Sequence, residues 1–169
     1  LRPSPEIQMK RLLGNGFDRI FEMGPCFRAG EVSSLHATEF TMLEWYRSDA
    51  DYHRILQDTQ SLVRECADAV AGTRLIDTAR GAVMLDEQWC TMSVDEAFAK
   101  SADATVEDAL GQGRFEQVLV EQVLPSLPQN VPCVLFDFPA ALGGLARPDD
   151  ANRLRLQRWE LFVQGIELA

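Results

Sequence analysis

The stretch RIFEMGPCFRAGEVSSLHATEFTMLEWYR, residues 19–47, has the pattern of two strands joined by a charged loop. The first half favours β-structure and ends in Arg28. In the second half the side chains of a strand would alternate between two faces, so that Phe40, Glu44 and Tyr46 share one face. A carboxylate among aromatic side chains is consistent with a half-exposed hairpin carrying a solvated glutamate or with a binding pocket. Spacing alone favours neither interpretation.

The residue types in this stretch carry a resemblance to a known family. The FR pair, a loop with His36 and the ending EFTMLEWYR resemble motif 2 of class II aminoacyl-tRNA synthetases, and within them the lysyl-tRNA synthetases. Together with SPEIQMKRLL upstream, this ending is most similar to the shortened paralogues that attach lysine to elongation factor P. The match covers residues 3–52, and a second block, RWELFVQGIELA at 158–169, is similar to the same family.

The resemblance implies an α+β fold, with an antiparallel sheet flanked by helices. We expect residues 1–169 to form a partial class II synthetase catalytic domain, with motif 2 at about 19–47 and a glutamate hairpin at about 154–169. Motifs 1 and 3 of the family are not in the sequence. We therefore expect this chain to be a fragment that is inactive alone, and to belong to a homodimer when complete.

Local patterns predict the remaining elements. Ser93 and Glu96 form a capping-box pattern, and Gln164-Gly165 is suited to a two-residue turn. Helices and strands do not alternate regularly, which favours an α+β fold over a parallel one. Helices are expected at about 5–13, 51–72, 93–100, from 105, and 114–124; strands at about 82–85, 131–138 and 154–163.

Composition limits the class of protein. A hydrophobic content of 46% in 169 residues indicates a globular chain. No apolar run approaches the ~20 residues of a membrane span, so we expect a cytoplasmic protein without a membrane partner. The net charge of −10 is unfavourable for general nucleic-acid binding. The four cysteines are scattered without a CxxC pair, which predicts reduced thiols and no structural zinc.

The C-terminal block makes a geometric prediction of its own. A two-residue turn at Gln164-Gly165 would place Phe162 opposite Glu167 and bring Glu160 onto the same face. Two neighbouring carboxylates repel each other unless a cation lies between them. They are either two solvated surface glutamates or the ligands of a Mg²⁺ ion that bridges to phosphate oxygens. The resemblance favours the second reading, since the matching glutamates of lysyl-tRNA-synthetase-like enzymes hold the ATP-bound metal.

The resemblance also implies roles in the ATP site. Arg28 corresponds to the arginine that binds the substrate carboxylate and the α-phosphate, where it would stabilise the charge of the transition state. His36 corresponds to a histidine near the ATP phosphates, and Phe40 to the aromatic residue that stacks on adenine. Gly30 stands at the position where the usual loop has an acidic residue. We assign the role of that residue to the neighbouring Glu31.

Three further residues are assigned to the amino-acid substrate by the same resemblance. Glu44 and Tyr46 correspond to residues that bind the side-chain ammonium group of lysine, and a carboxylate beside a phenol is a reasonable cation site. Glu6 corresponds to a residue that contacts the substrate α-amino group. From the sequence alone, Glu6 is equally well explained by its favourable interaction with the helix dipole.

These assignments predict an enzyme that uses ATP and Mg²⁺ to activate lysine or β-lysine as an adenylate. The acyl group would then pass to a lysine of elongation factor P. Charging of tRNA-Lys is the alternative within the enzyme class. A non-catalytic synthetase-like binding module is the alternative outside it, supported by the altered loop at 29–38 and the missing motif 3.

Overall fold

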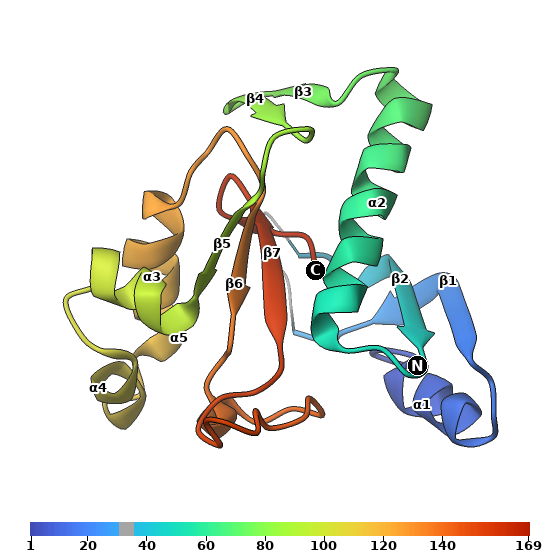
Figure 1. Ribbon diagram of the computed structural model, residues 1–169, viewed down its shortest axis with the longest axis horizontal. Helices are drawn as coiled ribbons and strands as arrows, with labels where there is room; N and C mark the ends of the chain where they lie inside the picture. Colours follow the sequence, from blue (N-terminus) through green and yellow to red (C-terminus); the bar gives the residue numbers. More distant parts are fainter. Residues whose placement is uncertain (31–35) are drawn as a thin grey trace. The chain divides into compact units, whose positions relative to one another are not determined.

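The computed structural model describes residues 1–30 and 36–169 (Figure 1). The chain divides into two compact units, Leu1–Ile55 and Leu56–Ala169, and each is described here by itself. Both combine helices with antiparallel strand pairs. The expected α+β class is therefore confirmed.

The first unit is built on the predicted hairpin. Strands β1 (Arg19–Phe27) and β2 (Glu39–Arg47) pair antiparallel over nine residues each, from Arg19 opposite Arg47 to Phe27 opposite Glu39. In this register Phe40, Glu44 and Tyr46 project from one face of the hairpin, as their alternation predicts. Exposed apolar side chains, Phe21 and Met23 among them, lie on the opposite face.

Helix α1 (Glu6–Gly14) precedes the hairpin. The Ser4 hydroxyl accepts a hydrogen bond of 3.0 Å from the Glu6 backbone N–H, which satisfies one of the free donors at the helix start. The helix ends in the segment Gly14-Asn15-Gly16, where Gly16 has a φ of 91° that favours glycine. The start and the end of this helix thus follow from local sequence.

The second unit contains most of helix α2 (Tyr52–Ala71) and two small sheets. One sheet is the hairpin of β3 (Leu75–Thr78) and β4 (Gly81–Met84). The other has the order β5-β6-β7-β8, formed by Cys90–Ser93, Cys133–Phe136, Trp159–Val163 and Ile166–Glu167. Strands β5 and β6 run parallel, which differs from the wholly antiparallel sheet expected.

Helices cover both faces of the four-stranded sheet (Figure 1). Phe162 and Leu135 pack with the helical segment on one face, whereas Leu161 and Val134 pack with Leu56 of α2 on the other. These four side chains are at most 3% exposed, so the sheet is the centre of the core. The helical segment comprises α3 (Val94–Ser101), α4 (Val106–Gly111), α5 (Phe115–Val118), the π-helix η1 (Leu119–Val123) and the 3₁₀-helix η2 (Leu124–Ser126).

Two expected elements differ from the structure. The helix expected at 114–124 changes from α to π at Leu119 and then to a 3₁₀ turn that includes Pro125. The strand expected from residue 154 begins only at Trp159. Arg155 is buried there because its guanidinium binds Asp95 at 2.5 and 2.8 Å, a long-range pairing that the alternating pattern could not indicate.

The helix starts predicted at residues 93 and 105 are confirmed. Ser93 caps α3 through a complete capping box with Glu96, and Thr105 caps α4. All four cysteines are free thiols. Among the described helices, none is long and apolar enough to cross a membrane.

Candidate functional site

The face of β2 that carries Glu44 is a connected polar site. Glu44 Oε1 accepts a hydrogen bond of 2.6 Å from the Tyr46 hydroxyl, and Oε2 accepts one of 2.9 Å from Ser4 Oγ. Ser4 lies immediately before α1, so the helix start and the strand together fix the carboxylate. Both Glu44 and Tyr46 are half-buried. A carboxylate held in this way is oriented to receive a cation.

A second carboxylate lies near the same phenol. Burial, the hydrogen bond to Glu44 and the charges of Glu44 and Glu6 all raise the pKa of Tyr46 above its ordinary value. Glu6 forms an ion pair of 2.7 Å with Lys10, one turn further along α1. The structure thus brings three predicted substrate residues, Glu6, Glu44 and Tyr46, into one negatively charged neighbourhood. Their binding roles remain predictions.

Arg28 and Phe40 lie together at the other end of the hairpin. The Arg28 backbone N–H donates to the Thr38 carbonyl at 3.0 Å, which extends the strand pairing by one step. Its guanidinium carbon is 5.3 Å from the centroid of the Phe40 ring, within cation–π range. His36 is exposed. Glu31, the other residue assigned to ATP, lies outside the described residues.

The C-terminal hairpin forms as predicted. Val163 pairs with Ile166 and Phe162 with Glu167, with Gln164 and Gly165 as the two turn residues at φ values of 52° and 74°. Positive φ at both positions is typical of the type I′ turn that suits hairpins. Glu160, two residues before Phe162, therefore shares a face with Glu167.

Tertiary contacts fix this turn. The Thr78 hydroxyl donates to the Gln164 side-chain oxygen at 2.7 Å, and Arg80 donates to the Gln164 backbone carbonyl at 2.8 Å. Gln164 is 6% exposed, although its place in a turn predicts exposure. These contacts from the β3–β4 hairpin stabilise the left-handed conformation of a residue that is not glycine.

Glu160 is buried, which differs from the alternative of two solvated surface glutamates. It is 9% exposed and accepts a hydrogen bond from Arg158. Burial, together with the charges of Glu167 and Glu116, raises the pKa of Glu160 to about 7, although Arg158 opposes this rise. An additional cation close to Glu160 would stabilise its ionised form.

Two carboxylates are all that this hairpin contributes. Within residues 1–30 and 36–169, no group of three or more His, Cys, Asp or Glu side chains could hold a metal ion. A Mg²⁺ ion bound mainly to phosphate oxygens needs only one or two carboxylates, so the pair fits that kind of metal. Arg28 and Glu44 belong to a different sheet from Glu160 and Glu167, and a common face for all four remains a prediction.

Sequence reasoning missed two residues that contact the carboxylates of Glu44 and Glu160. The sequence pattern gave no sign of the hydrogen bond from Ser4 to Glu44, forty residues away. Arg158 precedes Glu160 by two positions on an extended segment, and this spacing is a signal that could have identified their ion pair.

Comparison with known proteins assigns the chain to a family. The family model of the class II tRNA synthetases for D, K and N matches residues 1–169. The chain belongs to this family. It is 32% identical to a lysine–tRNA ligase of Psychrobacter cryohalolentis over all of the chain and 37% of that protein. It is 33% identical to those of Ectopseudomonas mendocina and Pasteurella multocida, over 100% and 99% of the chain and 37% and 38% of those proteins.

The class II synthetase chain thus spans a little over a third of the length of the curated relatives that it matches. These relatives are named for tRNA charging. The comparisons do not support the expected preference for elongation factor P as the acceptor. They agree with the ligase class and with a partial class II catalytic domain.

Proposed function

We propose that this class II synthetase chain belongs to an enzyme that activates lysine with ATP, forming lysyl-adenylate and releasing pyrophosphate. The observation that carries the proposal is the Glu44 carboxylate, which Ser4 and Tyr46 hold by two hydrogen bonds of 2.9 and 2.6 Å. A half-buried carboxylate with fixed orientation selects a substrate whose side chain ends in a cation. Among amino acids, lysine has such an ammonium group on a flexible stem.

Each site residue has one task in this proposal. Glu44 and Tyr46 bind the side-chain ammonium, while Glu6 binds the α-ammonium after Lys10 releases it. Arg28 binds the substrate carboxylate and the α-phosphate, and stabilises the charge that develops as the carboxylate oxygen attacks phosphorus. Phe40 supplies a ring face for adenine, with Glu31 and His36 near the ATP tail.

Glu160 and Glu167 would hold the metal that accompanies ATP. A Mg²⁺ ion held by these residues would supply positive charge that neutralises the phosphate oxygens. The chain's own contribution is to keep two carboxylates on one face of a rigid hairpin. Arg158 would favour the ionised form of the buried Glu160, because its positive charge opposes part of the effect of burial.

For the acceptor, the relatives' names favour tRNA-Lys, because all those reported above are lysine–tRNA ligases. Elongation factor P is a second candidate, supported by the EFTMLEWYR and SPEIQMKRLL segments and by the acidic charge of −10, which is unfavourable for binding RNA. A cytoplasmic homodimer is proposed for the intact protein in either case.

The test is lysine-dependent exchange of pyrophosphate into ATP by the intact protein that carries this chain. Exchange with lysine, and none with other amino acids, would support the proposal. The acceptor is then determined by offering tRNA-Lys and elongation factor P separately with labelled lysine. Lysine binding without any exchange would instead support the non-catalytic binding module.

A further inference from the structure

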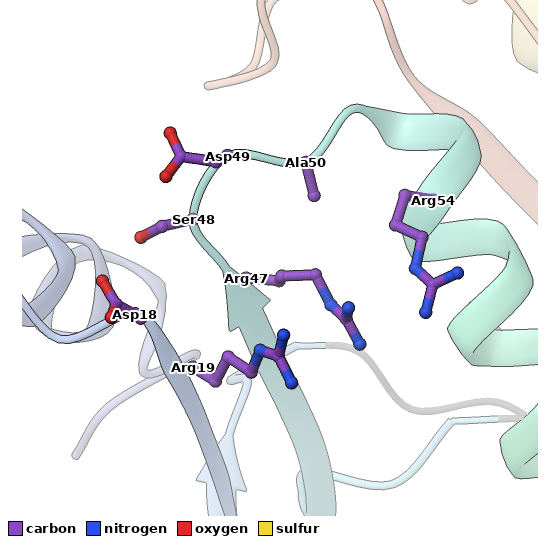
Figure 2. A pocket seen from close by; sticks show the side chains of 7 residues that line it. All are labelled: Asp18, Arg19, Arg47, Ser48, Asp49, Ala50 and Arg54. Carbon is purple, nitrogen blue, oxygen red and sulfur yellow. The ribbon is translucent and has the colours of Figure 1, made fainter.

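Three arginines converge at the end of the hairpin that is distant from Arg28. Arg19 is the first residue of β1, Arg47 is the last residue of β2, and Arg54 lies in the first turn of α2. Figure 2 shows their guanidinium groups turned toward a common space, a hollow of about 830 Å³. Asp18, Ser48, Asp49 and Ala50 complete its lining.

Two of these positive charges lie directly opposite each other in the hairpin. Arg19 and Arg47 are direct partners in the antiparallel register, and like charges at directly opposite positions destabilise a strand pair. Guanidinium groups cannot relieve the repulsion by losing a proton. Within the described part of the chain, the Arg19 guanidinium makes no hydrogen bond or ion pair. The two lining carboxylates, Asp18 and Asp49, point away from the arginines in Figure 2.

The chemistry of this hollow suits a phosphate group. Guanidinium groups form paired hydrogen bonds to phosphate oxygens, and three of them from separate elements can surround a tetrahedral anion. The N-terminal end of α2, a helix of 20 residues, adds positive potential there, and its first turn holds no acidic residue. Asp51 satisfies part of this helix end, since it accepts a hydrogen bond of 2.8 Å from the Arg54 backbone N–H.

The hollow is separate from the proposed ATP site. Arg19 and Phe27 are at opposite ends of β1, and eight steps of about 3.3 Å put them roughly 26 Å apart. Arg28 and Phe40 are at the Phe27 end. A phosphate held by Arg19 and Arg47 is therefore not the α-phosphate of an ATP molecule bound at Arg28.

We propose that Arg19, Arg47 and Arg54 form a second phosphate-binding site, distinct from the ATP site. Its ligand is either a free phosphate or pyrophosphate ion or a backbone phosphate of RNA, since these share the chemistry that the three arginines recognise. The chain as a whole has a net charge of −10, so a cluster of three arginines differs from its overall acidic character. Contacts from such a cluster to backbone phosphates would position an RNA strand. The inference does not depend on the proposed lysine activation.

The test compares the intact protein with its Arg19→Gln/Arg47→Gln double variant. Inorganic phosphate, pyrophosphate and a short RNA hairpin are titrated separately, the hairpin at two salt concentrations. Because two charged contacts are lost, the affinity for the ligand that the site binds should fall by at least about tenfold. For the hairpin, the slope of log affinity against log salt should decrease by about 2. The Arg153→Gln variant, changed at an exposed arginine on another loop, is the control.

The outcomes distinguish the two sources of phosphate. If the double variant loses affinity only for phosphate or pyrophosphate, the site binds a free anion. If it loses affinity for the RNA hairpin, the site binds the RNA backbone. Equal affinities of the double variant and the unchanged protein for all three probes would overturn the proposal, and so would the absence of binding to any of them. Circular dichroism confirms that the double variant is folded, and lysine-dependent exchange should be unchanged.

Discussion

The Tyr46 hydroxyl donates a hydrogen bond of 2.6 Å to the carboxylate of Glu44, two positions earlier on the same strand face. Ser4 completes the arrangement from the segment before α1. The pair leaves one phenol and one carboxylate fixed relative to each other before any substrate arrives. Such preorganisation lowers the entropic cost of binding a flexible ammonium group.

Glu44→Gln should strongly reduce lysine activation. The amide keeps the size of the side chain but loses the charge-assisted contact to an ammonium group, which is worth roughly 1.5–3 kcal/mol, or about 10- to 150-fold. The measurement is lysine-dependent ATP–pyrophosphate exchange over a range of lysine concentrations. Glu65→Gln, an exposed position on α2, is the matched control. An unchanged dependence on lysine would remove Glu44 from the substrate site.

The stability of the protein should fall between about pH 4.5 and pH 7 because of Glu160. Burial raises its folded-state pKa from 4.5 to about 7, so the folded protein holds this proton to higher pH than the unfolded chain does. The resulting stabilisation is fully present below the unfolded pKa and is lost as pH rises through the folded pKa. The shift corresponds to roughly 3 kcal/mol in the free energy of unfolding.

Urea denaturation across this pH range measures the effect. Glu160→Gln should remove this part of the pH dependence and should be more stable than the unchanged protein above the folded pKa. Glu167→Gln removes a charge that raises the pKa of Glu160 and should move the transition to lower pH. Identical pH profiles for Glu160→Gln and the unchanged protein would contradict the assignment.

Arg155→Met should destabilise the protein by about 1–2 kcal/mol, because it removes charge-assisted hydrogen bonds to two carboxylates. The Arg155 side chain is 8% exposed and binds Asp95 at 2.5 Å and Glu107 at 2.6 Å, so it joins the strand region to α3 and α4. The two carboxylates are themselves half-exposed, so water can solvate them once Arg155 is replaced, and the cost stays below that of breaking a fully buried pair. Chemical denaturation gives the value, with Arg153→Gln as the exposed control. A loss below about 0.5 kcal/mol would show that this network is dispensable.

Glu167→Gln should raise the Mg²⁺ concentration needed for half-maximal exchange by at least about tenfold. The exposed Glu167 adds little to stability, so the fold should be unaffected. The experiment is a Mg²⁺ titration of the exchange reaction at saturating lysine, with Glu87→Gln, another exposed glutamate, as the control. An unchanged Mg²⁺ requirement would exclude Glu167 as a metal ligand.

The sequence by itself determined the local elements and the pairing of two hairpins. Period-two alternation placed Glu44 beside Tyr46, and Gln164-Gly165 was sufficient to predict that Glu160 and Glu167 share a face. The capping box of Ser93 and Glu96 was also predicted from the sequence. These features depend on neighbours within a few residues, so local stereochemistry decides them.

Only the tertiary structure decided how these groups are surrounded. The burial of Glu160, the hydrogen bond from Ser4 to Glu44 and the late start of β7 after Arg155 each involve partners brought together by folding. The convergence of Arg54 with Arg19 and Arg47 has the same origin. Charge, desolvation and packing depend on distances in space, and the spacing of residues along a chain specifies such distances only within a helix or a strand pair.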